Sequence, residues 1–168
     1  MNARDVLDRY WSRNTPVPVP VDPFAIAKKA GVQVLEDTTI QAGCSGQASM
    51  EDSKPVIRYN PSEHEVRQRF TVAHELGHYF LGHLEGAKSG IVFRDGPAQF
   101  SASVFRPRET AANRFAAELL IPMDTLDDFI MKQKIVDGYD LAVRFNVSTI
   151  AIDIRVKEWQ RIRSRALA

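Results

Sequence analysis

Cysteine is almost absent from this sequence of 168 residues, since Cys44 is the only one. A single cysteine excludes an internal disulfide and a cysteine-rich zinc site, so any metal must be held mainly by nitrogen and oxygen ligands. Long apolar runs are absent too, because nowhere do 18 or more apolar residues follow one another. The first residues, MNARDVLDRYW, are charged where a signal peptide would be apolar. We therefore expect a cytoplasmic protein without a membrane segment.

An excess of charge of one sign is also lacking. The sequence has 22 lysines and arginines against 21 aspartates and glutamates. Such a balance excludes a global attraction to nucleic acid or acidic lipid, although it allows a local basic patch. The length suits one domain with a hydrophobic core and a small helical appendage.

Periodicity and turn residues predict an α+β fold. Apolar residues recurring at helical intervals predict helices at residues 3–13, 23–30, 62–81, 107–121 and 123–134, and a pair within 140–163. Strands are expected at 32–37 and 54–60, and we predict that they form a small antiparallel sheet packed on the helices. The intervening segment 84–106 is expected to be a long loop with room for a short strand.

Three of the four histidines fall within TVAHELGHYFLGH, residues 71–83. His74 and His78 are four residues apart, so on the expected helix they share a face one turn apart, which suits one tetrahedral metal. Glu75 points about 100° around the helix from His74, so it can reach a water on the metal without being a ligand. The alternative is a buried amphipathic helix whose two histidines belong to the core.

A third ligand should come from another helix, and RETAANRFAAELLIP offers two glutamates. Glu109 shares a helical face with Asn113, whereas Glu118 lies about 180° away and is expected to face solvent. If the Glu109 face packs against the histidine helix, Glu109 completes the ligand set and Asn113 can hydrogen-bond a ligand imidazole. The alternative for Glu109 is a first-turn glutamate favoured by the helix dipole.

These two segments resemble the ImmA/IrrE family of metallopeptidases, minimal relatives of the thermolysin-like gluzincins. FTVAHELGHYFLGH is followed by ETAANRFAAELLIP, which begins 31 residues after His78, in the order and spacing of the family's two motifs. The likeness extends over most of residues 17–160. It implies a zincin-like fold, with His74, His78 and Glu109 as metal ligands and Glu75 as the catalytic carboxylate.

The chemistry of such a site is metal-assisted hydrolysis, in which Glu75 takes a proton from water and passes it to the leaving amine. Two imidazoles and one carboxylate with an open position favour Zn²⁺, and Mn²⁺ is compatible with the same ligand types. The donor that stabilises the oxyanion stays open among His64, His83, Tyr59 and Tyr79. Of these, His83 follows the expected helix end and should lie off the ligand face.

Two further features concern the surroundings of the site. Gly77 costs the helix about 1 kcal/mol relative to alanine, which predicts that another backbone passes close to it. Enzymes of this class commonly hold a peptide as an added strand on a sheet edge, and residues 41–49 or 55–59 could supply that edge.

The C-terminal segment YDLAVRFNVSTIAIDIRVKEW resembles a helix-turn-helix, with a turn at residues 146–148 and Ser148 suited to cap the second helix. Basic residues recur from position 144 onward: Arg144, Arg155, Lys157, Arg161, Arg163 and Arg165. They suit a duplex-binding helix, but also a solvated hairpin packed on the catalytic helices, which the balanced charge favours. We expect a zincin-like domain at 1–134 and this helical segment at 135–168, with direct nucleic-acid binding not favoured.

Two functions of different classes follow from these features. The resemblance implies a metal-dependent endopeptidase that cleaves a regulatory protein, most commonly a helix-turn-helix transcriptional repressor. The alternative is a non-catalytic, metal-containing regulatory protein that acts through its C-terminal helices on DNA or on a partner protein. A structural metal site has no use for a free base beside the water, so the presence of Glu75 favours the peptidase.

Overall fold

The computed structural model describes residues 1–40, 43–84, 93–94 and 106–166. Its helices are α1 (Ala3–Tyr10), α2 (Pro23–Lys29), α3 (Glu65–Phe80), α4 (Arg106–Leu120), α5 (Met123–Asp127, continued by a π-helical turn over Asp128–Lys132), α6 (Gly138–Phe145) and α7 (Thr149–Ala166). Its strands are β1 (Gln33–Glu36), β2 (Gly46–Glu51), β3 (Lys54–Tyr59) and β4 (Phe93–Arg94). Apart from its two ends and β4, the predicted loop 84–106 lies outside the described residues. The fold is α+β, as the sequence predicts.

Local side-chain signals set several helix ends. Asp22 caps the first turn of α2, and Pro23 occupies the first helical position, where its missing N–H costs nothing. Asn146 adopts the left-handed conformation (φ 51°) and ends α6, and the Ser148 hydroxyl then accepts a backbone hydrogen bond (3.2 Å) in the first turn of α7. The predicted turn at 146–148 and its cap are confirmed.

Helix α3 begins at Glu65, three residues later than its periodicity predicts. The Asn60 side chain accepts a hydrogen bond from the Ser62 backbone (2.9 Å), which holds this stretch in a turn. His64 then serves as the N-cap of the helix.

The sheet is mixed rather than antiparallel. Its strand order is β1-β3-β2-β4, in which β2 and β3 form an antiparallel hairpin and β1 pairs with β3 in parallel. The tight turn at Asp52 and Ser53, both with positive φ, closes the hairpin and leaves the far edge of β3 open for β1. Residues 55–59 are therefore interior to the sheet and cannot supply a substrate-binding edge, which corrects the prediction for that segment.

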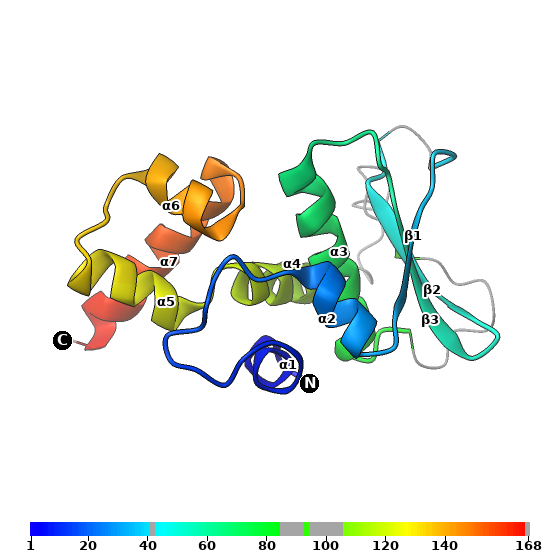
Figure 1. Cartoon of the computed structure of the whole chain (residues 1–168), viewed down its shortest axis with the longest axis horizontal. Helices are drawn as coiled ribbons and strands as arrows, with labels where there is room; N and C mark the ends of the chain where they lie inside the picture. The colour runs from blue at the N-terminus through cyan, green and yellow to red at the C-terminus, as the bar shows by residue number, and fades with distance from the viewer. Residues whose placement is uncertain (41–42, 85–92, 95–105, 167–168) are drawn as a thin grey trace.

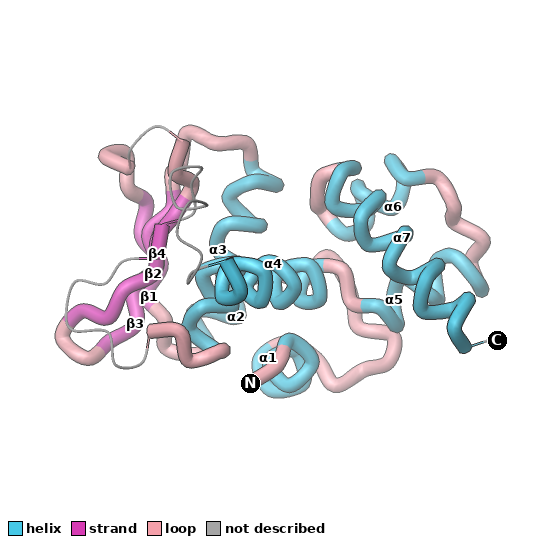
Figure 2. The backbone as a smooth tube through the Cα atoms, turned by 180° about the vertical axis from the view of Figure 1, so that it is seen from behind, coloured by secondary structure: helices cyan, strands magenta, loops and turns pink. Residues whose placement is uncertain are grey.

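The two helices that carry the histidine and glutamate motifs lie between the sheet and the C-terminal helices (Figure 1; Figure 2). One side of α3 packs on β2 and β3, and the other packs on α4. The core between them is formed by Val72, Ala73, Leu76, Phe115, Ala116 and Leu119, together with Ala48 and Ile57 from the sheet. This packing fixes the positions of both motifs.

The helices α5, α6 and α7 gather at the end of the molecule opposite the sheet (Figure 1). Buried Leu141, Phe145 and Ile152 pack there with Leu126 in a core continuous with that of α3 and α4. The division of the chain at residue 134 stays a prediction. Within the described residues, no helix combines the length and apolarity needed to cross a membrane.

Two arginines tie these parts together. Arg155 of α7, 4% exposed, donates to the carbonyl of Ile121 (3.0 Å) and pairs with Glu118 and Glu158. Arg69 of α3, 7% exposed, donates to two backbone carbonyls, one in the proline-rich connector and one in the α6–α7 turn. The C-terminal helices are thus packed on α3 and α4 through buried, hydrogen-bonded charges.

Candidate metal centre

Three side chains converge between α3 and α4. His74 Nε2 lies 3.1 Å from His78 Nε2, and the Glu109 carboxylate oxygens lie 3.2 Å from His74 Nε2 and 3.4 Å from His78 Nε2. The two histidines face α4 because they are one helical turn apart, and Glu109 faces α3 from the first turn of α4. These three residues form a group that could hold a metal ion.

The spacing of these donor atoms fits a tetrahedral ion. Zinc–nitrogen and zinc–oxygen bonds of about 2.0–2.2 Å at tetrahedral angles separate neighbouring ligand atoms by about 3.3–3.5 Å. The two imidazole nitrogens are 3.1 Å apart, and each faces a different oxygen of the Glu109 carboxylate, at 3.2 Å for His74 and 3.4 Å for His78, so these distances are within about 0.2 Å of this spacing. The donor set, two imidazole nitrogens and one carboxylate oxygen, is also one that zinc accepts with a further position open.

Burial differs among the three candidate ligands. The side chains of His74 and His78 are 1% and 0% exposed, whereas that of Glu109 is 15% exposed, so access from solvent is on the Glu109 side. Burial alone would raise the pKa of Glu109, but its close contacts with the imidazoles of His74 and His78 outweigh it and lower the pKa to about 2. The carboxylate is therefore ionised, as a metal ligand must be.

Asn113 holds the ring of His74 from behind. Its side-chain oxygen lies 2.9 Å from His74 Nδ1, and an amide oxygen can only accept, so Nδ1 carries the proton. This tautomer leaves the lone pair of Nε2 directed at the point where the three side chains converge. The structure thus brings together Asn113 and His74 in the contact that the sequence analysis expects of them.

His83 makes the corresponding contact with His78, which the sequence analysis missed. The two Nδ1 atoms are 3.0 Å apart. Burial, followed by the positive charges of His78 and Arg108, lowers the pKa of His83 to about 4, so its ring is neutral and able to accept a hydrogen bond. His83 follows the end of α3, as predicted, and it packs on the outer nitrogen of His78 rather than on the nitrogen that faces His74 and Glu109.

The end of α3 explains the position of His83. Gly82 has a φ of 76°, its backbone N–H bonds to the carbonyl of Tyr79, and the N–H of His83 bonds back to the carbonyl of His78 (2.9 Å). These two bonds make a Schellman motif, which folds the chain back over the last helical turn. Gly82, the ninth residue of HELGHYFLGH, was the available signal, since a glycine at the C-terminal end of a helix places the next residue beside the helix rather than beyond it.

Glu75 lies on the sheet side of α3. Its side chain is fully buried, and its Cγ is 3.7 Å from the position that a Cβ on Gly46 would occupy. Such a Cβ would also come within 2.3 Å of the Thr71 methyl group, so only glycine allows β2 to approach α3 this closely. Glu75 is thus positioned by β2, on a different face of the helix from the two histidines.

Gly77 has the role that the sequence predicts. A Cβ at this position would lie 3.1 Å from Ala112 Cα, 3.2 Å from the Ala112 carbonyl oxygen and 3.2 Å from Phe115 Cβ. The prediction that another backbone passes close to Gly77 is confirmed, and that backbone belongs to α4. The close approach brings Glu109, one turn earlier on α4, within reach of the histidines.

The other candidates from the sequence have different roles. Glu118 is 39% exposed and pairs with buried Arg155 rather than simply facing solvent. Among the possible oxyanion donors, His64 caps the start of α3 and the Tyr59 hydroxyl donates to Glu36 (3.1 Å). Both are therefore engaged away from the histidine pair.

Comparisons with known proteins place the chain in a family. The model of the family described as "IrrE N-terminal-like domain" (Peptidase_M78) matches residues 27–157. A solved structure described as a Mycobacterium tuberculosis transcriptional regulator is similar, with a TM-score of 0.60 and 16% identity, over 89% of this chain and 43% of that one. This chain thus spans less than half of that protein, and at this identity the likeness shows the fold alone. No curated protein matches the sequence at a significant level.

Proposed function

The chain belongs to the Peptidase_M78 family of IrrE N-terminal-like domains, and from this premise we propose that it is a metal-dependent endopeptidase acting on a regulatory protein. The observation that carries the proposal is the convergence of His74, His78 and Glu109 at 3.1–3.4 Å. Glu75, next to the first of these residues, supplies a buried carboxylate for proton transfer.

We propose Zn²⁺ as the metal, held by His74, His78 and Glu109, with Mn²⁺ as the other ion that these donors suit. Zinc in such a site lowers the pKa of a bound water to about 7 and polarises a carbonyl group. The proposal is supported by the donor types and by the close approach of the three side chains, at 3.1–3.4 Å.

The protein's own residues do the rest of the chemistry. The Glu75 carboxylate accepts a proton from the attacking water and delivers it to the nitrogen of the departing amine. Its burial excludes bulk water, which would compete for that proton. Asn113 and His83 hold the outer nitrogens of the two imidazoles and so fix the ring orientations during turnover.

We propose that the substrate is a cytoplasmic helix-turn-helix transcriptional repressor. Support comes from the resemblance of the two motifs to the ImmA/IrrE peptidases and from the similar structure described as a transcriptional regulator. In this proposal residues 1–134 form the peptidase domain and residues 135–168 a helical segment packed on it. The alternative, a non-catalytic metal-containing regulator, has no need of Glu75.

Metal content and cleavage measured together test the proposal. Bound metal is measured by mass spectrometry in the parent protein, in Glu75→Gln, in Glu109→Gln and in the matched control Asp153→Asn, which changes an exposed carboxylate on α7 to an amide. Each is then incubated with the helix-turn-helix regulators encoded nearby. We expect about one metal per chain in all but Glu109→Gln, and cleavage only by the parent and Asp153→Asn. Cleavage by Glu75→Gln at the parental rate would refute the role of Glu75, and a parent that binds no metal would refute the peptidase proposal.

A further inference from the structure

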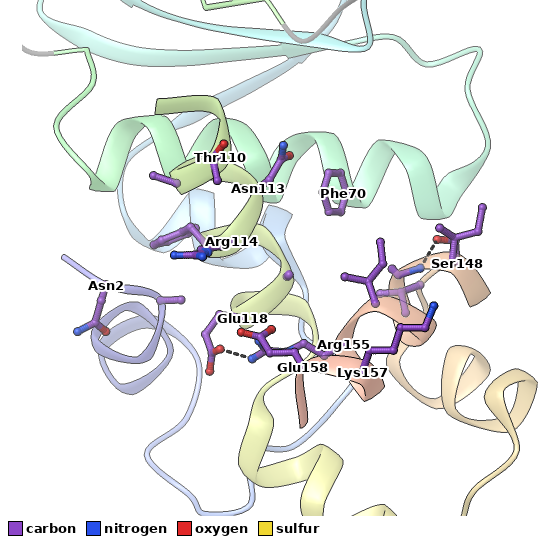
Figure 3. Close-up of a pocket in the computed structure, with 18 of the residues that line it drawn as sticks. Asn2, Phe70, Thr110, Asn113, Arg114, Glu118, Ser148, Arg155, Lys157 and Glu158 are labelled. Atoms are coloured by element: carbon purple, nitrogen blue, oxygen red, sulfur yellow. Dashed lines mark hydrogen bonds and ion pairs between the residues drawn. The ribbon is translucent and has the colours of Figure 1, made fainter. Parts of the chain in front are cut away.

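A large groove separates α7 from the α3–α4 pair (Figure 3). Its volume is about 1180 Å³, above the range of about 300–1,000 Å³ that is typical of small-molecule sites. The groove is therefore large enough for a segment of another protein.

The α7 wall of this groove is apolar. Ile150 and Ile154 lie one helical turn apart and are 70% and 63% exposed, although both are large apolar side chains. Opposite them, Val66 and Phe70 of α3 line the groove, and Phe70 points from α3 towards α7 (Figure 3). Exposed apolar side chains gathered at a concave surface mark an interaction site.

The polar lining of the groove is mainly cationic. Arg114 of α4 and Lys157 and Arg161 of α7 line it and form no ion pair with any residue that the structure describes. The carboxylates that line it belong to Glu118 and Glu158, and both pair with Arg155 (Figure 3). The groove thus offers positive charge whose natural complement is acidic.

The groove also adjoins the candidate metal centre. Asn113 lines it while hydrogen-bonding His74 (2.9 Å). The Phe70 ring, on the same wall, has its centroid 6.4 Å from that of His74. A protein segment in the groove would therefore lie against the back of the ligand histidine, close to but apart from the point where the ligands converge.

We propose that this groove docks an acidic amphipathic helix of the protein substrate, an inference that rests on the peptidase function proposed above. The apolar face of such a helix contacts Ile150, Ile154 and Phe70, and its acidic flanks meet Arg114, Lys157 and Arg161. A helix laid in a groove between helices, with anchors one turn apart, is an established mode of peptide recognition. Docking here holds the substrate while another part of it reaches the metal centre.

A nucleic-acid duplex fits this surface less well than a protein segment. A helix-turn-helix reads a duplex with the first turns of its second helix, which must stand clear to enter the major groove. In this structure Ser148, Ile150 and Ile154, from the first turns of α7, line the same groove as α3 and α4. Isoleucines there also lack the hydrogen-bonding groups that read base edges.

Fluorescence anisotropy with synthetic peptides tests the proposal. The probe is a labelled amphipathic helical peptide of about 15 residues with leucines on one face and glutamates on its flanks. The comparison probes are the same peptide with lysines in place of the glutamates, and a labelled DNA duplex. The protein variants are Lys157→Glu/Arg161→Glu and Ile154→Gln, whose changed side chains are exposed. The matched control, Lys28→Glu/Lys54→Glu, makes the same charge change at exposed positions outside the groove.

We expect the acidic peptide to bind the parent and the control with the same affinity. Its affinity should be at least about tenfold lower for Lys157→Glu/Arg161→Glu and about fivefold lower for Ile154→Gln. The lysine peptide should not bind. Equal binding of the acidic peptide to parent and groove variants, or no binding at all, would overturn the proposal. Preferential binding of the duplex, lost in Lys157→Glu/Arg161→Glu, would overturn it in favour of nucleic acid.

The same assay separates this inference from the peptidase function. Glu75→Gln and Glu109→Gln change residues that do not line the groove, so both should bind the acidic peptide within about twofold of the parent. If the parent holds metal and cleaves its substrate but binds no acidic peptide, the docking inference alone fails. If the peptide binds as expected but no metal is held, the peptidase function alone fails.

Discussion

The contact between Gly77 and the α4 backbone sets the distance between the two histidines and Glu109, the proposed metal ligands, so Gly77→Ala should weaken metal binding. The new Cβ would lie 3.1 Å from Ala112 Cα and 3.2 Å from Phe115 Cβ. Carbon atoms pack best at about 3.5–4.0 Å, so α4 must move away by about 0.4 Å or more. Glu109 moves with it, which opens the separations of 3.2 and 3.4 Å to His74 and His78.

Two opposing terms determine the stability of Gly77→Ala. Alanine in a helix interior gains about 1 kcal/mol over glycine, whereas overpacking costs about 1–3 kcal/mol. The net destabilisation is therefore about 0–2 kcal/mol, which lowers the melting temperature by up to about 8 °C in a protein of this size. A movement of about 0.4 Å or more uses up most of the displacement of about 0.5 Å that such a site tolerates, so we expect zinc affinity to fall by up to about tenfold.

The assay is a competitive zinc titration alongside thermal unfolding with and without metal. Gly138→Ala is the matched control, since a Cβ there meets only Asp153 Oδ1 at 3.7 Å, an ordinary contact. It should keep the parental zinc affinity and unfold at the same temperature or slightly higher. If Gly77→Ala is more stable than the parent and binds zinc equally well, the reasoning is wrong, because α4 would then not be held at its closest approach.

Two other positions give equally direct tests. His83→Ala removes the hydrogen-bond partner of His78 and should lower zinc affinity about 10–100-fold. His83→Gln can still accept a hydrogen bond and should restore part of that affinity. Unchanged affinity in a zinc titration of His83→Ala would contradict this role. Gly46→Ala places a Cβ 2.3 Å from the Thr71 methyl group, so β2 must move away from α3 and chemical unfolding should show a loss of about 1–3 kcal/mol. Gly46→Ala should also slow cleavage while leaving zinc affinity near the parental value, since Gly46 lies beside Glu75 whereas the two histidines face Glu109 on α4. An equal loss of both would argue against that division.

The parts of the site that the sequence predicts are those determined by helical geometry. His74 and His78 share a face because of their spacing, and Glu109 and Asn113 share another for the same reason. Gly77 also carries its own signal, because glycine is unfavourable in a helix unless something needs the space. Each of these inferences involves residues within two turns of one another.

The parts that the sequence does not predict depend on contacts between distant segments or on how a helix ends. The parallel pairing of β1 with β3 follows from which edge of the β2–β3 hairpin stays open, and local patterning carries no information on that choice. The contact of His83 with His78 could not be predicted from the helix end alone, because it depends on how the chain turns back over the last turn of α3 at Gly82. The partner of Glu118, Arg155, is 37 residues away on α7.

Arg69 has a consequence for how the molecule unfolds. Its buried guanidinium donates to the carbonyl of Val21 (2.6 Å) in the proline-rich connector and to that of Asn146 (3.0 Å) in the α6–α7 turn. Loss of either segment would leave a buried charged donor without its acceptor, a state costly enough to destabilise the other segment as well. We therefore expect the N-terminal connector, α3 and the C-terminal helices to unfold as one cooperative unit, so that heating gives a single transition where a protein with two independent domains gives two.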